Sequence, residues 1–394
     1  MNTEIYGGTL TNFGDELMLR RIASELTARI AGFAPVVYPQ DLRYLIRAQL
    51  GLQHILPGEG RGPLVARAGV VLVESLAPKR LRQLQHLYGV VSSGSVDGLV
   101  TLSGFAFSDQ WPGAATKAAI KVFRRYVRRG KPVILLPQAL GPFRDRESRE
   151  AFREIVGLAD LVFARDDFSL NYAKSAAGDS SKLRRAYDIT LVETRAHPTN
   201  DDVTKPRVSL VPNQRMIDRA SARWSARYLE TMTALAQALV ERGPAVDVVV
   251  HDRAAGDLQL ASEIVKRVPS VRLIHLHDPT VARAYLAQAA AVVSSRYHAL
   301  VGALAHGVPV LGVGWAHKYQ GLFEDFGLSN WCVSEEDSID QIVDKALALC
   351  SDDTNSAIRR AIDQVLPNIA AATSAMWDDV SHVLVAGTTN PHGS

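Results

Sequence analysis

The sequence of 394 residues contains only two cysteines, Cys332 and Cys350, and lacks several features of specialised protein classes. Two cysteines provide no disulfide framework, so we expect a reducing compartment. No apolar run reaches the roughly 18 residues that a transmembrane helix requires. The N-terminus, MNTEIYGGTL, has neither the charged nor the apolar segment of a signal peptide. The sequence therefore predicts a cytoplasmic protein without a transmembrane segment.

An excess of charge of one sign is also missing. Lysine and arginine together number 44, aspartate and glutamate number 41, and the net charge is +3. Basic pairs such as Arg124-Arg125 and Arg128-Arg129 occur in mixed helical surroundings, which is typical of solvated helix faces. We expect no nucleic-acid partner, because such partners require a concentrated basic surface. The dispersed basic faces would still permit peripheral contact with the inner face of the cytoplasmic membrane.

Sequence motifs for common cofactors and metals are absent as well. Neither GxGxxG nor GxxxxGK[ST] occurs, so a dinucleotide or P-loop site is poorly supported, and no GxSxG motif suggests acyl hydrolysis. His275 and His277 would share one face of a strand, but no further Cys or His pair at matching spacing completes a metal site. We therefore predict no metal and no resident cofactor.

Short apolar runs alternate with longer stretches of helical period along most of the chain. This alternation is typical of βαβ units with parallel strands, and a chain of this length predicts two domains. Buried strands are expected, for example, at residues 70–73 and 98–102. The α/β fold predicted here has two Rossmann-like domains facing across a cleft. The predicted parts are an N-terminal domain (1–195), a linker (196–206), a C-terminal domain (207–367), a closing helix (368–386) and a disordered tail (387–394).

The most informative segment, beginning AAAVVSSRYH, places basic residues after two predicted strands. Arg296 and His298 follow the strand AVVS, in the first turn of the next predicted helix. Helix N-termini favour negative charge, so basic residues there suggest that an anion binds beside them. Lys318 follows the next strand, VPVLGVG, so we expect it near this pair. Each residue alone would be interpreted as a surface charge or a packed histidine. His306, next to a glycine, is interpreted as part of a helix end.

Polar residues in the N-terminal half also follow predicted strands. Asn12 and Asp15 lie in the turn GGTLTNFGDE, where they could cap a helix or bind substrate hydroxyls. Gln138 lies in PQALGP, directly after a strand, and is a candidate for the wall of the cleft. Arg165 and Asp166 follow the strand LVFA, where they could form a surface ion pair or belong to the site.

Four segments together resemble the polysaccharide pyruvyl transferase family. They are TNFGDE, KPVILLPQALGPF, ADLVFARDDFSLNYA and SSRYHALVGALAHGVPVLGVGWAHKYQGLFEDFGL. The last is the most specific, with S-x-R-x-H, a helix of small residues, G-x-P, and a lysine twenty residues after the histidine. The sequence departs from the family at Ser103-Gly104-Phe105, where the family usually has a doubled glycine.

The resemblance implies a fold like that of GT-B glycosyltransferases. It also implies the transfer of a pyruvyl group. In that reaction a pyruvyl group passes from phosphoenolpyruvate to two hydroxyls of a sugar, forming a cyclic ketal and releasing phosphate. The acceptor would be a cell-surface or exopolysaccharide, or its lipid-linked or nucleotide-linked precursor.

The resemblance also implies roles for individual residues. Arg165, Arg296 and Lys318 would bind phosphoenolpyruvate, and Arg296→Ala should abolish that binding with the fold intact. His298 would act as an acid or base, or bind the departing phosphate. Asp15 is a candidate base or acceptor ligand. Asn12 and Gln138 are the tentative acceptor ligands.

Two alternative functions remain open from the sequence. A nucleotide-sugar-dependent glycosyltransferase of the same fold would also need basic residues for its diphosphate in the C-terminal domain. A non-catalytic intracellular protein could use the same residues to bind an anion or a sugar. The released product distinguishes the three functions. Phosphate indicates pyruvyl transfer, a nucleoside diphosphate indicates glycosyl transfer, and binding without turnover indicates a non-catalytic protein.

Overall fold

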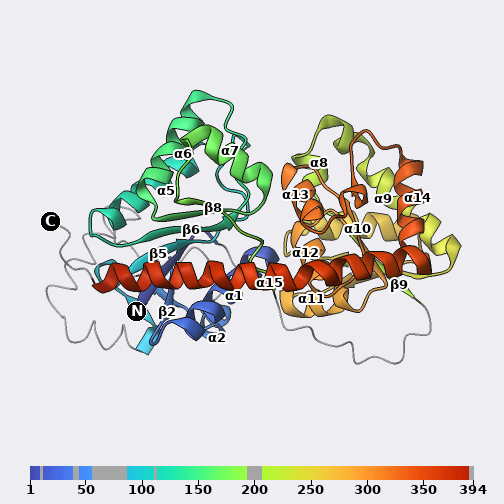
Figure 1. Cartoon of the computed structure of the whole chain (residues 1–394). Helices are drawn as coiled ribbons and strands as arrows, with labels where there is room; N and C mark the ends of the chain where they lie inside the picture. Colours follow the sequence, from blue (N-terminus) through green and yellow to red (C-terminus); the bar gives the residue numbers. More distant parts are fainter. Residues whose placement is uncertain (9–11, 39–43, 56–86, 111–112, 193–205, 390–394) are drawn as a thin grey trace. The chain divides into compact units, whose positions relative to one another are not determined.

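The structure is a computed structural model that describes residues 1–8, 12–38, 44–55, 87–110, 113–192 and 206–389 (Figure 1). The strand predicted at 70–73 lies outside these residues, as do residues 196–205 of the predicted linker. Among the described residues, no helix is long and apolar enough to cross a membrane.

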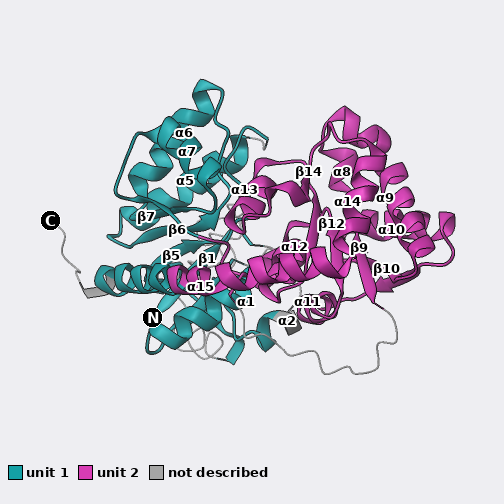
Figure 2. Ribbon diagram, turned by 45° about the vertical axis from the view of Figure 1, so that its right-hand side comes forward, with its two compact units in different colours: residues 1–10, 18–186, 374–394 teal, residues 11–17, 187–373 magenta. Residues whose placement is uncertain are grey.

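The chain forms two compact units, coloured separately in Figure 2. Unit 1 comprises residues 1–10, 18–186 and 374–394, and unit 2 comprises residues 11–17 and 187–373. Most of each unit comes from one half of the chain, as the sequence indicates. Residues 11–17, however, pack with the C-terminal half. The single predicted division near residue 195 does not describe this exchange.

Unit 1 contains a parallel sheet in the order β4-β3-β2-β1-β5-β6-β7-β8 within the described residues. Its helices α5 to α7 lie on one face of the sheet, and α1 and α2 lie on the other (Figure 1). The strands are β1 (Asn2–Tyr6), β2 (Ala34–Val37), β3 (Gln53–Ile55), β4 (Val90–Val91), β5 (Gly98–Thr101), β6 (Val133–Gln138), β7 (Leu161–Ala164) and β8 (Leu183–Arg185). The helices are α1 (Phe13–Arg29), α2 (Tyr44–Gln49), α5 (Gly113–Val127), α6 (Arg146–Leu158) and α7 (Asp167–Ala177).

Unit 2 contains a second parallel sheet, in the order β11-β10-β9-β12-β13-β14. Numbered within the unit, this order is 3-2-1-4-5-6, the Rossmann arrangement. Its strands are β9 (Arg207–Val211), β10 (Ala245–Val250), β11 (Arg272–His275), β12 (Ala291–Ser294), β13 (Val310–Val313) and β14 (Cys332–Val333). Its helices are α8 (Arg215–Asp218), α9 (Ala222–Arg242), α10 (Ala255–Arg267), α11 (Pro279–Ala287), α12 (Tyr297–Ala305), α13 (His317–Asp325) and α14 (Ile339–Leu349). The predicted α/β class is confirmed.

The central strands are continuous apolar runs because helices cover both faces of a parallel sheet. All residues of β12 and β13 are buried. Helix α9 begins at the cap Ser221 and ends at Gly243, whose φ of 109° suits a residue without a side chain. It packs against α10 and α14, whereas α11 packs against α12.

The closing helix is longer than the sequence indicates. Helix α15 extends over Asp352–Thr389, so it begins well before the predicted segment 368–386 and includes the first residues of the predicted tail. Pro367 lies inside it and obscured the first half in the sequence pattern. Its last part belongs to unit 1, where Asp378 pairs with Arg29 at 3.0 Å and Asp379 with Arg184 at 2.5 Å.

Candidate active site

The candidate site lies at the point in unit 2 where the strand order reverses. Strands β9 and β12 are neighbours there, and the connections that follow them lead in opposite directions along the sheet. Ligands of doubly wound sheets bind at such a position, beyond the carboxyl ends of the strands. The two strand ends are joined, because the Asn213 side chain donates a hydrogen bond to the Ser295 carbonyl at 2.8 Å.

The turn between β12 and α12 is held from several sides. The Ser294 hydroxyl accepts a hydrogen bond from the Arg296 amide at 2.9 Å. The Tyr228 hydroxyl donates to the Ser295 hydroxyl at 2.7 Å, and the Tyr319 hydroxyl donates to the Ser295 carbonyl at 2.8 Å. These bonds orient the start of α12 before any ligand arrives.

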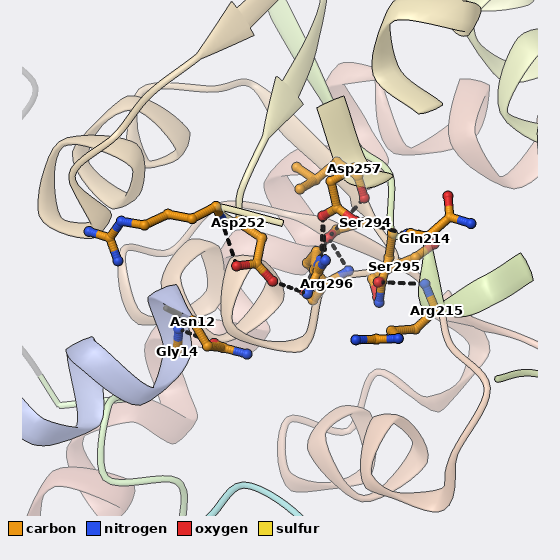
Figure 3. A network of polar contacts seen from close by, with 12 residues as sticks. Asn12, Gly14, Gln214, Arg215, Asp252, Asp257, Ser294, Ser295 and Arg296 are labelled. Atoms are coloured by element: carbon orange, nitrogen blue, oxygen red, sulfur yellow. Dashed lines mark hydrogen bonds and ion pairs between the residues drawn. The ribbon is translucent and has the colours of Figure 1, made fainter. Parts of the chain in front are cut away.

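Arg296 is the residue that caps α12, and two carboxylates of the protein bind its guanidinium (Figure 3). Its Nη1 atom lies 2.6 Å from Asp252, and its Nε and Nη2 atoms lie 2.6 and 2.5 Å from Asp257. Burial opposes the charge of Arg296, but Asp257 and Asp252 outweigh it and raise its pKa above the ordinary value. One cation against two anions leaves this cluster with a net negative charge. The anion that the sequence placed beside Arg296 is therefore supplied, at least in part, by the protein itself.

His298 lies in the first turn of α12, with a carboxylate nearby. Its Nε2 atom is 3.8 Å from an oxygen of Asp188. Asp188 in turn accepts hydrogen bonds from the amide and hydroxyl of Thr190, at 2.9 and 2.6 Å. The buried Arg283 donates to the Thr190 carbonyl at 2.6 Å. These contacts hold Asp188 in place 3.8 Å from the imidazole, where the two can form an ion pair when His298 is protonated.

The N-terminal turn of α1 contacts the same residues from another side. Gly14 packs so closely against His298 that a Cβ atom at position 14 would lie 2.0 Å from its Nδ1 atom. The Phe13 ring lies 5.5 Å from the His251 ring and 4.7 Å from the Arg253 guanidinium. Glu16 pairs with Arg253 at 2.9 Å. The glycine in the TNFGDE segment is therefore explained by the space that His298 occupies.

Asn12 and Asp15 occupy the first turn region of α1. The Asn12 side-chain oxygen accepts hydrogen bonds from the amides of Gly14 at 2.7 Å and Asp15 at 3.3 Å, so its capping role is observed (Figure 3). Asp15 lies among the first helical residues, where an acid suits the helix dipole. The roles of Asn12 in acceptor binding and of Asp15 as a base stay predictions.

Lys318 lies in the first turn of α13, after β13, as the sequence indicates. Its Nζ atom is 5.4 Å from the ring centroid of Tyr297, 5.9 Å from that of Trp315 and 5.6 Å from that of Tyr319. Because Tyr297 is flanked in the chain by Arg296 and His298, the structure brings Lys318 to the start of α12. Gly314 is needed here, since a Cβ atom on it would lie 2.2 Å from the Tyr319 ring.

Arg165 and Gln138 belong to unit 1, at the carboxyl ends of β7 and β6. Arg165 is only 2% exposed and donates to the Gly104 carbonyl at 3.0 Å, so the interpretation as a surface ion pair is wrong. Asp166 is also buried and caps α7 by accepting a hydrogen bond from the Ser169 amide at 2.7 Å. The assignment of Arg165 to the donor stays a prediction.

Gln138 is completely buried, which was not expected for a wall of the cleft. Its amide nitrogen lies 3.4 Å from both the Thr101 hydroxyl and the Leu136 carbonyl. In this position the side chain supports the interior of unit 1. Its role as an acceptor ligand stays a prediction.

The other histidines named from the sequence lie elsewhere. His306 ends α12, and its Nδ1 atom lies 2.9 Å from the Gly302 carbonyl, which agrees with a structural role. The rings of His275 and His277 lie 4.4 Å apart. Within the described part of the chain, no group of three or more His, Cys, Asp or Glu residues could hold a metal ion.

The sequence missed the acidic partners of Arg296 and His298, and it missed His251. Asp252 follows the largely apolar strand β10 by two positions, which is a signal that could have marked it. Asp188 comes three residues after β8, whose sequence LRR is not apolar, so no such signal marks it. Asp257 lies in α10, where an acid in the first turn is ordinary. Only the fold shows that it reaches Arg296.

Comparisons with known proteins identify a family for most of the chain. The sequence model of the family described as polysaccharide pyruvyl transferase matches residues 12–317. The matched region includes the α1 turn, Arg165, Arg296 and His298. The sequence matches none of the curated proteins with which it was compared.

Solved structures of similar fold include proteins crystallised with nucleotides or sugars. The UDP-GlcNAc 2-epimerase of Neisseria meningitidis, bound to UDP-GlcNAc, has a TM-score of 0.58 at 12% identity, covering 98% of this chain and 100% of its own. MnaA of S. aureus, in complex with UDP, has a TM-score of 0.57 at 12% identity, and the match covers 92% of this chain and 90% of MnaA. HepE of Anabaena, in complex with UDP and glucose, has a TM-score of 0.55 at 14% identity, and the match covers 97% of this chain and 100% of HepE. At such identities these likenesses show a GT-B-like fold alone.

Proposed function

This chain belongs to the polysaccharide pyruvyl transferase family, and from that membership we propose that phosphoenolpyruvate is its donor. It is a transferase whose acceptor is a polysaccharide. In the proposed reaction, the pyruvyl group becomes a cyclic ketal on two sugar hydroxyls, and phosphate is released. The observation that carries the proposal is the family match, which spans the S-x-R-x-H turn at the start of α12.

The donor has a carboxylate and a phosphate on a three-carbon frame, so it requires several N–H donors and at least one cation. Lys318 is the cation that we assign to it, because its Nζ atom lies 5.4 Å from the ring of Tyr297, the residue between Arg296 and His298. The first amides of α12 supply further donors. A guanidinium has five N–H groups, and Arg296 uses three of them to bind Asp252 and Asp257. One N–H group on each terminal nitrogen is left to bind the donor.

The proposed chemistry requires two proton movements. One sugar hydroxyl attacks C2 of the donor as C3 takes up a proton, and the second hydroxyl displaces phosphate to close the ketal. One hydroxyl proton balances the proton gained at C3, and the other leaves with the phosphate. We assign these proton transfers to His298, an imidazole at the start of α12 with the Asp188 carboxylate 3.8 Å from its Nε2 atom.

The remaining assignments in this proposal concern the acceptor. Asp15 and Asn12 are proposed to bind or activate its hydroxyls, with support from their place beside Gly14 and His298. We propose that the acceptor belongs to a cell-surface or exopolysaccharide pathway, as a lipid-linked or nucleotide-linked precursor. The proposed chemistry needs no metal or resident cofactor, and places the enzyme in the cytoplasm or at the inner membrane face.

The donor proposal is tested by equilibrium binding in the absence of an acceptor. Isothermal titration should show one phosphoenolpyruvate bound per chain. Lys318→Met should weaken that binding about 10- to 100-fold, because one charge-assisted interaction is lost. Lys266→Met, which alters an exposed lysine of α10, is the matched control and should bind normally.

Nucleotide sugars are titrated in parallel because one similar structure contains UDP-GlcNAc and two others contain UDP. Tight binding of UDP-glucose or UDP-GlcNAc by a protein that ignores phosphoenolpyruvate would establish the glycosyltransferase alternative instead. If the wild type and Lys318→Met bound phosphoenolpyruvate with equal affinity, Lys318 would not be a residue of the donor site.

A further inference from the structure

His251 is a buried histidine beside the residues of the candidate site. It directly follows β10, at the carboxyl edge of the unit 2 sheet, and is only 3% exposed. The Phe13 ring packs edge-on against it at 5.5 Å, with 70° between the ring planes. The imidazole is therefore held in one place by the first turn of α1.

The residues that follow His251 connect three parts of the candidate site. Asp252 binds Arg296 at the start of α12, and Arg253 binds Glu16 in α1. His251 itself lies close enough to Arg296 and His298 for both to oppose its protonation. Burial first, and then these two neighbours, lower the pKa of His251 to about 3. The ring is therefore neutral at pH 7.

The Nε2 atom of His251 is buried, and no hydrogen-bond partner reaches it among the residues that the structure describes. More than nine in ten buried polar groups in native proteins have a partner. Leaving one unsatisfied is destabilising, because its desolvation is not compensated. An orphaned imidazole nitrogen in a cluster that includes Arg296 and His298 indicates a bond that is completed only when a ligand is present.

We infer that His251 is a further binding residue of the donor site, and that its Nε2 atom makes a hydrogen bond to an anionic group of the bound donor. The inference rests on the proposed function, because it takes phosphoenolpyruvate as the ligand. A neutral imidazole can present one N–H group. It therefore offers the anion a donor without placing a second buried cation beside Arg296 while the site is empty.

Three substitutions of His251 test this bond by steady-state kinetics with phosphoenolpyruvate. His251→Phe keeps the ring and removes Nε2, and should raise the KM for phosphoenolpyruvate about 10- to 100-fold. Its thermal unfolding should stay close to that of the wild type, because the Nε2 atom has no protein partner among the described residues. His251→Gln places an amide nitrogen near the position of Nε2 and should restore most of the affinity. His251→Asn, which reaches only the position of Nδ1, should not.

The outcomes separate this inference from the function on which it rests. A wild-type protein that never consumes phosphoenolpyruvate contradicts the proposed function. An active wild type together with an unchanged KM in His251→Phe overturns the inference alone. If His251→Phe does not fold, the comparison of His251→Gln with His251→Asn tests the inference. Equal KM values for these two variants would overturn it. His275→Gln, at an exposed histidine of β11, is the matched control and should behave as the wild type.

Discussion

Replacing Arg296 with alanine should lower the free energy of unfolding by about 3–5 kcal/mol. The substitution leaves Asp252 and Asp257 without their cation, although they are only 6% and 0% exposed. Activity should be lost as well, because the start of α12 loses its anchor. For a unit of this size, the thermal unfolding midpoint should fall by roughly 10 °C, which differential scanning fluorimetry measures.

This expectation corrects the sequence-based prediction that Arg296→Ala leaves the fold intact. Arg296→Ala combined with Asp252→Asn and Asp257→Asn should recover much of the stability but not the activity. Arg215→Ala is the matched control, because Arg215 pairs with Asp218 on the exposed surface and should contribute at most about 1 kcal/mol. An unchanged unfolding midpoint for Arg296→Ala would show that the two carboxylates do not depend on it.

Replacing Gly14 with alanine should reduce kcat/KM by about 10²–10⁴-fold, the range for loss of a positioned acid or base. The added Cβ atom would lie 2.0 Å from Nδ1 and 2.5 Å from Cε1 of His298, so the imidazole must move. Alanine otherwise favours a helix by about 1 kcal/mol over glycine. The loss should therefore approach that of His298→Gln, and adding Gly14→Ala to His298→Gln should cost little more.

Gly157→Ala is the control for this substitution. Gly157 also lies in a helix, α6, but a Cβ atom there meets nothing within 4 Å among the described residues. That variant should keep full activity and gain a little stability. If Gly14→Ala were fully active while His298→Gln was not, the imidazole would not require the position that the structure gives it.

The βαβ pattern predicts much of this fold because it is local. Apolar runs of strand length are visible in the sequence, and the strand ends that carry Arg296 and Lys318 were located from them. The helix cap Ser221 and the glycine that ends α9 are equally local signals. The length of α15 was missed because Pro367 ordinarily interrupts a helix, whereas here the helix continues through it.

The partners of the site residues could not be predicted in the same way. Asp252 reaches Arg296 from the segment after β10 and Asp257 reaches it from α10, whereas Asp188 approaches His298 from the segment after β8. Such contacts depend on the order of strands in the sheet, which no local pattern encodes. The same holds for Gly14, whose small size is explained only by a histidine from the other half of the chain.

The most direct test of the account is to incubate the purified protein with phosphoenolpyruvate and a panel of lipid-linked and nucleotide-linked sugars. Acceptor mass and inorganic phosphate are then measured together. The account predicts an acceptor that gains one pyruvate less one water, with one phosphate released per acceptor and both hydroxyls lost to a ketal. Release of a nucleoside diphosphate while phosphoenolpyruvate remains unconsumed would contradict it.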